Sequence, residues 1–172
     1  MIRRIDAADW ERLRDVRLRG LAADAHAFLL SLERAREFPE AHWRDRATPN
    51  ETQATFVEER DGAFIAIVAA FIGEDPETAY LVGMWVAPEV RGTGVAVRLV
   101  ERVLDWAREH RRTRVVLSVK RGNEAAVGLY AKCGFVEIPE PADLPYEPGP
   151  DNHFYAHELW RPSGARVFRN DA

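Results

Sequence analysis

The stretch at residues 86–110, "VAPEVRGTGVAVRLVERVLDWAREH", constrains the fold more than any other part of the chain. The run before it, "TAYLVGMWVA", reads as a strand that Pro88 stops. Apolar residues then recur at i, i+3, i+4 and i+7, which predicts a helix over 96–110. Gly92 and Gly94 lie between the two, where glycine allows a positive φ or the close approach of another group. The stretch therefore predicts a strand–turn–helix unit in a chain of mixed α and β structure.

This glycine turn has the features of an anion-binding site. The first turn of a helix offers backbone N–H groups without intrahelical partners, and the helix dipole adds partial positive charge there. Two glycines remove the side chains that would keep an anion away, so the turn is suited to a phosphate. It lacks the Lys-Ser/Thr of a P-loop and the G-x-G-x-x-G of a Rossmann turn. A tight structural turn without a ligand is the alternative that the glycines alone leave open.

The remaining elements follow from periodicity and turn signals. Asp61-Gly62 between two strand-like runs predicts a type I′ hairpin, and Asn123 and Gly134 fit the two caps of one helix. The segment 26–38 stays open between a loop and an irregular helix, and the proline-rich 139–150 reads as a long loop. Further strands are expected at 2–5, 114–119, 135–138 and 152–160, and further helices at 8–23, 39–47 and 123–133. In the helix at 8–23, a mostly apolar face at 3/4 spacing includes Leu13, Val16, Arg17, Leu18 and Leu21.

Length and composition bound the classes of function. The 172 residues suit one domain, which we expect at 1–162 with a tail at 163–172. A net charge of -4 argues against nucleic acid as the main partner. A single cysteine, Cys133, excludes an internal disulfide, and the histidines show no metal-ligand spacing, so we expect no metal. Without a signal-peptide core or a long apolar run, the chain is predicted to be cytoplasmic, with no membrane association.

Two motifs resemble a known family. "RGTGVA" (91–96) matches the pattern Q/R-x-x-G-x-G/A of the GNAT superfamily of N-acetyltransferases, and "VAP" (86–88) precedes it as is usual there. "NEAAVGLYAKCGFVE" (123–137) resembles the family's second signature, and the order of elements over 2–160 resembles the whole GNAT fold. Ala96 stands where glycine is commoner, a variation that the pattern allows. The resemblance implies an α/β fold of α+β type, with a mixed central sheet of about seven strands and helices on both faces.

The resemblance also implies a site for coenzyme A, with acetyl-CoA as co-substrate. The turn would hold the pyrophosphate through backbone N–H groups, and the strand before it would splay from its neighbour and pair with the pantetheine amides. Arg91 is either a further contact or a solvated side chain, and Asn123 is a helix cap, a CoA contact or both. Bulky Met84 and Trp85 near the thioester end favour a short acyl group; a longer acyl donor is the alternative, since the sequence does not show which of the two side chains faces the pocket. The expected CoA-binding residues are Met84, Trp85, Val86, Arg91, Gly92, Thr93, Gly94, Val95, Ala96 and Asn123.

The chemistry implied is direct attack of a primary amine on the thioester. Tyr130 stands where the family commonly has a tyrosine that protonates the leaving sulfur; packing of the helix on the sheet is the alternative. Glu77 is the candidate base near the start of the fourth strand, and a water chain leading to backbone carbonyls is the alternative. Cys133 is expected to be a small buried apolar group. A non-catalytic acyl-CoA-binding or sensor module on the same fold is the competing function.

The acceptor site would be built by residues 21–43 and 139–153. These segments contain aromatics and carboxylates, which would suit a small cationic amine held by charge and by cation–π contact. We predict Phe28 and Tyr146 as acceptor-binding residues, with Tyr146 of the proline-rich loop over the amine. Peptide N-termini, amino acids, polyamines and aminoglycoside-like compounds all remain open as acceptors, and so does a homodimer.

Overall fold

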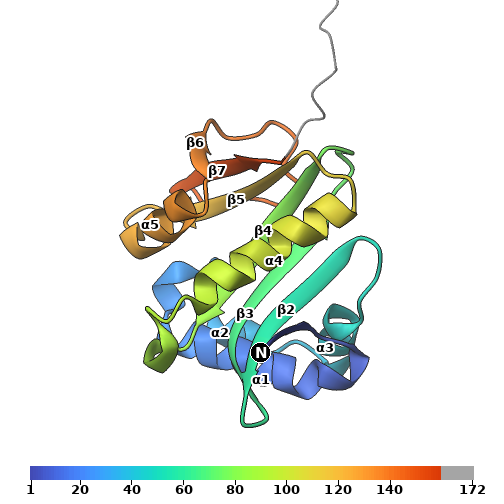
Figure 1. Ribbon diagram of the computed structural model, residues 1–172. Helices are drawn as coiled ribbons and strands as arrows, with labels where there is room; N and C mark the ends of the chain where they lie inside the picture. Colours follow the sequence, from blue (N-terminus) through green and yellow to red (C-terminus); the bar gives the residue numbers. More distant parts are fainter. Residues whose placement is uncertain (160–172) are drawn as a thin grey trace, which may run out of the picture.

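The computed structural model describes residues 1–159. They form one seven-stranded sheet with the order β1-β2-β3-β4-β5-β7-β6, which confirms the predicted mixed sheet of about seven strands (Figure 1). The strands are β1 Ile2–Arg4, β2 Gln53–Arg60, β3 Ala63–Ile72, β4 Thr78–Val86, β5 Arg114–Lys120, β6 Val136–Ile138 and β7 Asn152–Glu158. The helices are α1 Trp10–Ala23, α2 Leu32–Arg36, α3 Glu40–Ala47, α4 Val95–Glu109 and α5 Glu124–Lys132.

The sheet has two antiparallel halves that meet at one parallel pair. Strands β1 to β4 pair antiparallel in chain order, β4 and β5 are parallel, and β7 lies antiparallel between β5 and β6. The β2–β3 turn has positive φ at both Asp61 (50°) and Gly62 (78°), which confirms the predicted type I′ hairpin. The parallel pair needs a crossover, and α4 supplies it. The sequence therefore determines this junction through the strand–turn–helix unit.

Helices cover both faces of the sheet (Figure 1). Helix α4 packs on one face, where Leu99, Val100 and Val103 are each 0% exposed in the larger core cluster. Burying one such side chain contributes about 1.5–3 kcal/mol, which makes α4 a rigid support for the turn that precedes it. Helices α1 and α3 pack on the other face, with Val16 and Trp43 in a second core cluster. The prediction of helices on both faces is confirmed.

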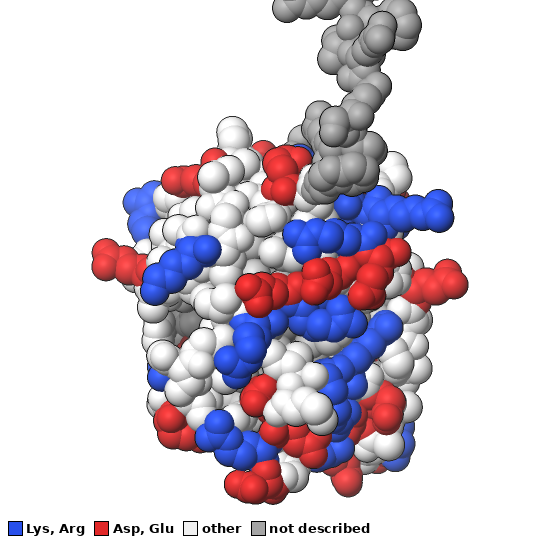
Figure 2. Space-filling view, viewed as in Figure 1, with Lys and Arg blue, Asp and Glu red and all other residues white. Residues whose placement is uncertain are grey.

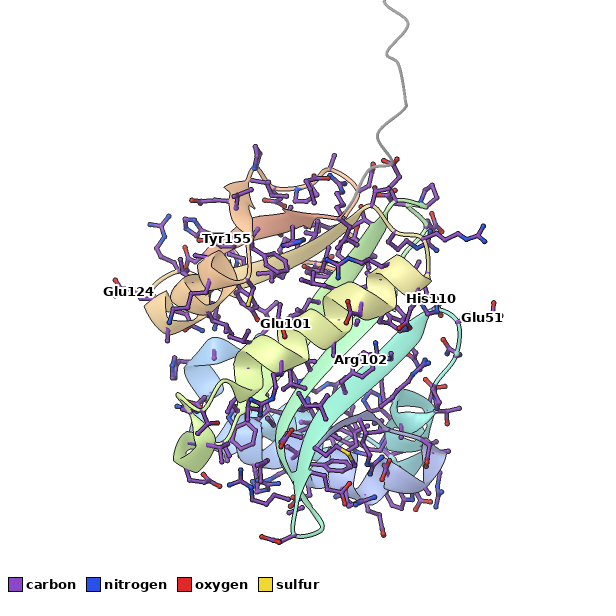
Figure 3. All side chains as sticks on the ribbon, viewed as in Figure 1. Glu51, Glu101, Arg102, His110, Glu124 and Tyr155 are labelled. Atoms are coloured by element: carbon purple, nitrogen blue, oxygen red, sulfur yellow. The ribbon has the colours of Figure 1, made fainter. Side chains whose placement is uncertain are left out.

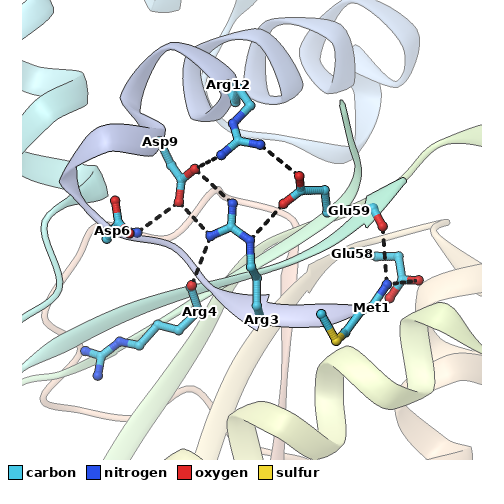
Figure 4. Close-up of polar contacts among 8 residues, drawn as sticks. All are labelled: Met1, Arg3, Arg4, Asp6, Asp9, Arg12, Glu58 and Glu59. Carbon is cyan, nitrogen blue, oxygen red and sulfur yellow. Dashed lines mark hydrogen bonds and ion pairs between the residues drawn. The ribbon is translucent and has the colours of Figure 1, made fainter. Parts of the chain in front are cut away.

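A cluster of ion pairs fastens β1 and α1 to β2. This N-terminal arginine cluster consists of Arg3, Asp9, Arg12 and Glu59 (Figure 4). Asp9 is 2% exposed and accepts two hydrogen bonds from Arg3, at 2.7 and 2.9 Å, and another from Arg12. Arg3 also donates to Glu59 at 2.8 Å. The bond from Arg3 lowers the pKa of the Asp9 carboxyl to about 2, so the buried charge is fully compensated.

The segment that the sequence left open between a loop and a helix, 26–38, contains the short helix α2, capped by Ser31, whose side chain accepts from the Arg34 amide. Asn123 caps α5 in the predicted way, and Gly134 follows that helix with φ +85°. The predicted strand at 135–138 begins one residue later, because Phe135 is 4% exposed and packs into the core. The predicted domain end at 162 and the tail at 163–172 lie outside the described residues.

The surface carries charges of both signs. Basic and acidic side chains are interspersed over the face seen in Figure 2, and a band of acidic side chains crosses its middle. Along α4 the exposed acidic residues are Glu101, Asp105 and Glu109. None of the helices within residues 1–159 is long and apolar enough to cross a membrane.

Candidate active site

The two central strands part where the glycine turn begins. Strand β4 pairs with β5 only through Thr78–Tyr80, opposite Arg114–Val116. Beyond Val116, β5 pairs with β7 alone among the strands of residues 1–159. The β5-facing edge of β4 is therefore free of strand partners over its last residues, which include Met84, Trp85 and Val86. The predicted splaying of this strand from its neighbour is confirmed.

A β-bulge lies in the free part of β4. The register with β3 shifts between Ile67, opposite Trp85, and Ala69, opposite Val82, so β4 carries one extra residue there. Gly83, within the bulge, has φ +63°, a conformation that favours glycine. Met84 and Trp85, consecutive in the strand, point to opposite faces of the sheet. Trp85 packs against α1 and is 5% exposed, whereas Met84 packs on the core cluster that contains Tyr130.

The glycine turn is open to a ligand. Gly92 and Gly94 have φ of 78° and 82°, as predicted for a turn that needs positive φ. Gly94 is the N-cap of α4, and no side chain caps the helix, so its first N–H groups keep their hydrogen-bonding capacity. No heavy atom lies within 4 Å of a Cβ built on Gly92. An uncapped helix start beneath open space fits a pyrophosphate, and the free β4 edge fits the amides of pantetheine.

Arg91 is tied back to the protein. Its Nη2 lies 2.5 Å from Oδ2 of Asp24, at the end of α1, and its Nε donates to the Val86 carbonyl at 3.0 Å. The same Asp24 oxygen accepts from the Trp85 indole at 2.8 Å. Arg91 thus already has a carboxylate partner, and its visible role is to hold the glycine turn against α1.

Tyr130 lies on α5, on the side that faces the core. It is 5% exposed, and its ring meets Phe135 edge-on with centroids 5.6 Å apart. Burial raises the pKa of its phenol above the usual value, with a smaller contribution from Cys133, so the group stays protonated at neutral pH. Within residues 1–159 its hydroxyl has no hydrogen-bond partner, which leaves the proton available to a ligand.

Two hollows flank α5. Glu101 of α4 and Cys133 line one of about 420 Å³, and Tyr155 of β7 lines another of about 270 Å³ with Asn123 and Glu124 (Figure 3). Asn123 is a helix cap, with Oδ1 accepting from the Ala126 amide at 3.2 Å. Burial raises the pKa of the partly exposed Cys133 thiol, which keeps it neutral. The helix that carries Tyr130 therefore borders open space on both sides.

The structure does not bring Glu77 together with Tyr130. Glu77 is exposed and precedes β4 at the end where that strand still pairs with β5. Met84 lies seven positions further along the chain, which is about 23 Å along an extended strand. Its backbone carbonyl accepts from the Thr113 amide at 2.8 Å. The position gives no support to the predicted base role.

A cavity of about 350 Å³ lies on the other side of β4, against α1 and α3. We call it the α1–α3 cavity. Its aromatic lining residues are Phe38, Trp43 and Phe71, and its charged or titratable ones are Arg17, His42 and Arg46. The carboxylates predicted for an acceptor site do not line it: Glu33, Asp143 and Glu147 are all exposed elsewhere. This cavity therefore gives no support to a carboxylate-lined acceptor site, which stays a prediction; composition does not reveal the direction in which side chains point.

Arg17 reaches into this cavity from α1. Its Nη1 donates to the Gly83 carbonyl at 3.3 Å, and its guanidinium lies 5.2 Å from the centroid of the Phe28 ring. Burial, with a smaller contribution from Arg46, lowers the pKa of Arg17 to about 10. Phe28, predicted as an acceptor-binding residue, thus contacts the cation. The sequence signal that could have singled out this residue is an arginine among apolar residues at 3/4 spacing, which indicates a cation on the buried side of a helix.

Two further residues border the cavity. His42 stacks on Phe38 with centroids 4.1 Å apart, and burial together with Arg46 lowers the pKa of its imidazole. Tyr146 lines an adjoining hollow of about 460 Å³ that shares Arg46 and Phe71 with the α1–α3 cavity. The proline-rich loop therefore brings Tyr146 beside the cavity, as predicted, although its contact with an acceptor stays a prediction.

Sequence comparison gives an independent finding. Residues 16–135 match the family model described as Acetyltransferase (GNAT) family, and this range includes the glycine turn, the free edge of β4 and Tyr130. The N-acetylaspartate synthetase of Rattus norvegicus is 40% identical over 75 residues, which are 44% of this chain and 25% of that protein. The uncharacterized N-acetyltransferase YobR of Bacillus subtilis is 40% identical over 55 residues, 32% of this chain and 22% of that protein. The matches thus span about a quarter of these relatives' length.

Solved structures share the fold. The GNAT domain of S. lividans PAT superposes with a TM-score of 0.75 at 18% identity, covering 92% of this chain and 89% of that one. The PaiA N-acetyltransferase of Thermoplasma acidophilum, solved in complex with coenzyme A, gives a TM-score of 0.69 at 16% identity, covering 92% and 98%. At these identities the likeness establishes the architecture alone.

Proposed function

The chain belongs to the acetyltransferase (GNAT) family, and on that premise we propose that it transfers an acetyl group from acetyl-CoA to a primary amine of its acceptor. The observation that carries the proposal is the parting of β4 from β5 beside an uncapped, glycine-bearing helix start. When bound, acetyl-CoA supplies an activated acetyl thioester. The location in the cytoplasm stays a prediction from the sequence.

The residues proposed to hold the co-substrate act mainly through their backbone. The turn offers the N–H groups of Gly92, Thr93, Gly94, Val95 and Ala96 to a pyrophosphate, because the helix start has no other cap. The free edge of β4 at Met84, Trp85 and Val86 offers strand-like hydrogen bonds to an extended chain. Arg91 supports the turn through Asp24 rather than by direct contact, and Asn123 orders the start of α5.

The proposed chemistry uses two properties of the site. Tyr130 Oη donates a proton to the leaving sulfur, because burial keeps the phenol protonated and no protein group within residues 1–159 accepts that proton. The attacking amine must be neutral. Arg17 and Arg46 on the acceptor side disfavour a third positive charge and so lower the pKa of an ammonium group bound there. The attacking nitrogen then loses one proton to solvent through a water chain, and the Tyr130 phenolate regains a proton from water, so the proposal needs no carboxylate base and gives Glu77 no role.

A second candidate function is supported by the same observation. The free edge of β4 and the glycine turn account for the binding of acyl-CoA and do not by themselves require turnover, so an acyl-CoA-binding module is the second candidate. The two functions differ in one measurable property, which is the release of free CoA when an amine is present.

The test is a thiol-release assay with acetyl-CoA and a panel of amines. The panel contains polyamines, peptides with free N-termini and amino acids; the name of the rat relative, N-acetylaspartate synthetase, is a reason to include the last class. Amine-dependent release of CoA supports the transferase. Calorimetric binding of acetyl-CoA without release by any amine supports the binding module, and absence of binding overturns both.

A further inference from the structure

The α1–α3 cavity holds positive charge that the described protein does not neutralise. Of its charged lining residues, Arg17 and Arg46 form no ion pair with any of residues 1–159. Elsewhere on α1 and α3, Arg19 bonds Asp15 at 2.8 Å, and Arg44 bonds Glu40 at 2.6 Å. Arg46 is exposed to solvent, whereas Arg17 is partly buried. A guanidinium without an ion-pair partner is costly away from bulk water, so the presence of Arg17 here needs a reason.

Arg17 is held in one orientation. Its Nη1 donates to the Gly83 carbonyl, and its plane lies near the Phe28 ring, so two contacts from different elements position the guanidinium. Glycine suits position 83 because its φ is +63°, and a Cβ there would lie 3.0 Å from Arg17 Nη1, so a larger residue would displace the guanidinium slightly. The remaining N–H donors of Arg17 have no acceptor within the described chain. The geometry is that of a prepared anion receptor with its donors unused.

The receptor lies next to the reacting edge of the sheet. Gly83 belongs to the bulge of β4, immediately before Met84 on the free edge. A group bound by Arg17 would therefore lie close to Met84. In the proposed function, this part of β4 binds the end of the co-substrate that carries the thioester. The cavity of about 350 Å³ has room for a small molecule, and its aromatic walls provide apolar contact for the remainder of that molecule.

We propose that the acceptor amine carries a carboxylate, which Arg17 binds from α1 with Arg46 adding charge at the rim, so that the acceptor is of the amino-acid class. This inference rests on the proposed function, since it names the substrate of the same transfer. A planar carboxylate matches the fork of a guanidinium better than a point charge would. Binding of the carboxylate neutralises Arg17, and Arg46 remains to disfavour the ammonium form of the nearby amine.

The test compares acceptors that differ only in the carboxylate. Each amino acid is assayed beside its α-carboxamide, and aspartate and glutamate beside asparagine and glutamine, by thiol release. We expect kcat/KM of the wild type to be at least tenfold higher for the carboxylate of the preferred pair. In Arg17→Met, the acceptor KM should rise at least tenfold and this preference should fall toward one, while the acetyl-CoA KM stays unchanged.

Two further variants separate charge from structure. Arg17→Lys keeps a charge without the fork and should recover part of the preference, whereas Arg14→Met, at an exposed position on the same helix, should behave as wild type. A wild type that favours the carboxamides, or an Arg17→Met enzyme that keeps the wild-type preference, overturns the proposal.

A binding measurement distinguishes this proposal from the transferase itself. Thermal shift in the presence of acetyl-CoA, with the same acceptor pairs, reports binding without turnover. Carboxylate-dependent stabilisation that Arg17→Met abolishes, in a protein that releases no CoA, keeps the anion receptor and rejects the transferase. Turnover of amines without any carboxylate discrimination keeps the transferase and rejects the receptor. No stabilisation by any carboxylate-bearing amine, together with no turnover, rejects both.

Discussion

Helix α1 contributes arginines to two regions of opposite character. Arg12 belongs to the N-terminal arginine cluster, where it donates to Asp9 and, at 3.0 Å, to Glu59 (Figure 4). Arg17, five positions further on, enters the α1–α3 cavity, where it meets a carbonyl and an aromatic ring but no carboxylate of residues 1–159. The pKa values reflect the difference: hydrogen bonds to Asp9 raise that of Arg3, whereas burial lowers that of Arg17 to about 10.

The contrast separates groups that stabilise the fold from groups kept for a ligand. In the cluster every buried charge has its partner, so its contribution is realised when the chain folds. The cavity, the free edge of β4 and the uncapped start of α4 keep donors without protein acceptors. Unsatisfied groups of this kind reduce stability unless something binds, which is typical of functional sites. Variants in the two regions should therefore differ in whether stability or activity changes.

The largest effect is expected at the proton donor in the open region. Tyr130→Phe keeps the ring and its packing on Phe135 and removes only the hydroxyl, so kcat should fall about 100-fold at unchanged thermal stability. Tyr80→Phe is the matched control, since Tyr80 is equally buried in the part of β4 that pairs with β5. Steady-state kinetics check the prediction. An equal kcat for wild type and Tyr130→Phe, with chemistry limiting, would leave Tyr130 as a packing residue.

The cluster should show the reverse behaviour. Asp9→Asn removes the charge that Arg3 and Arg12 bind, and the free energy of unfolding should fall by about 2 kcal/mol with kcat/KM unchanged. Because the folded protein holds the pKa of Asp9 at about 2, its contribution is present above pH 4 or so and is lost as the pH falls from about 4 to about 2. Urea unfolding across this range should show that loss in wild type and not in Asp9→Asn. Identical pH profiles would contradict the assignment.

Valine substitutions at two glycines test whether the glycine turn at Gly92 binds acetyl-CoA, because both substitutions should cause the same backbone strain. Gly92 and Gly62 both have φ of +78° and open space around a Cβ, so valine should strain both turns to the same extent. Gly92→Val should raise the Kd of acetyl-CoA at least tenfold by filling the proposed pyrophosphate space, and Gly62→Val should leave the Kd unchanged. Calorimetry with both variants gives the answer. Equal affinities would remove the turn from the binding site.

The smallest effect is expected on the free energy of unfolding when two arginines of α1, Arg17 and Arg12, are replaced. Arg17→Met deletes a partly buried cation without a partner, so the free energy of unfolding should stay the same or rise by about 1 kcal/mol. Arg12→Met, which breaks two ion pairs on the same helix, should lower it. Denaturant unfolding of the two variants side by side measures both. A clear loss of stability in Arg17→Met would mean that Arg17 serves the fold and not a ligand.

The sequence by itself determined the features whose conformation depends only on residues nearby in the chain. Positive φ at Asp61 and Gly62, the cap at Asn123 and the open turn at Gly92 and Gly94 follow from local sterics and hydrogen bonds within a few residues. The family resemblance of the two motifs then extended this local information to the whole sheet, including the splaying of β4.

Only the tertiary structure decided the charge of the α1–α3 cavity. Arg91 and Trp85 both donate to Asp24, which lies more than sixty residues away along the chain. Arg17 donates to the carbonyl of Gly83, which is 66 positions away. No pattern in the sequence states which carboxylate an arginine will find, or that it will find none. Glu77 is next to β4 in the sequence, and the structure places it at the end of that strand that still pairs with β5. Periodicity determines which side of an element is apolar, whereas the partner of each polar group depends on how distant elements pack together.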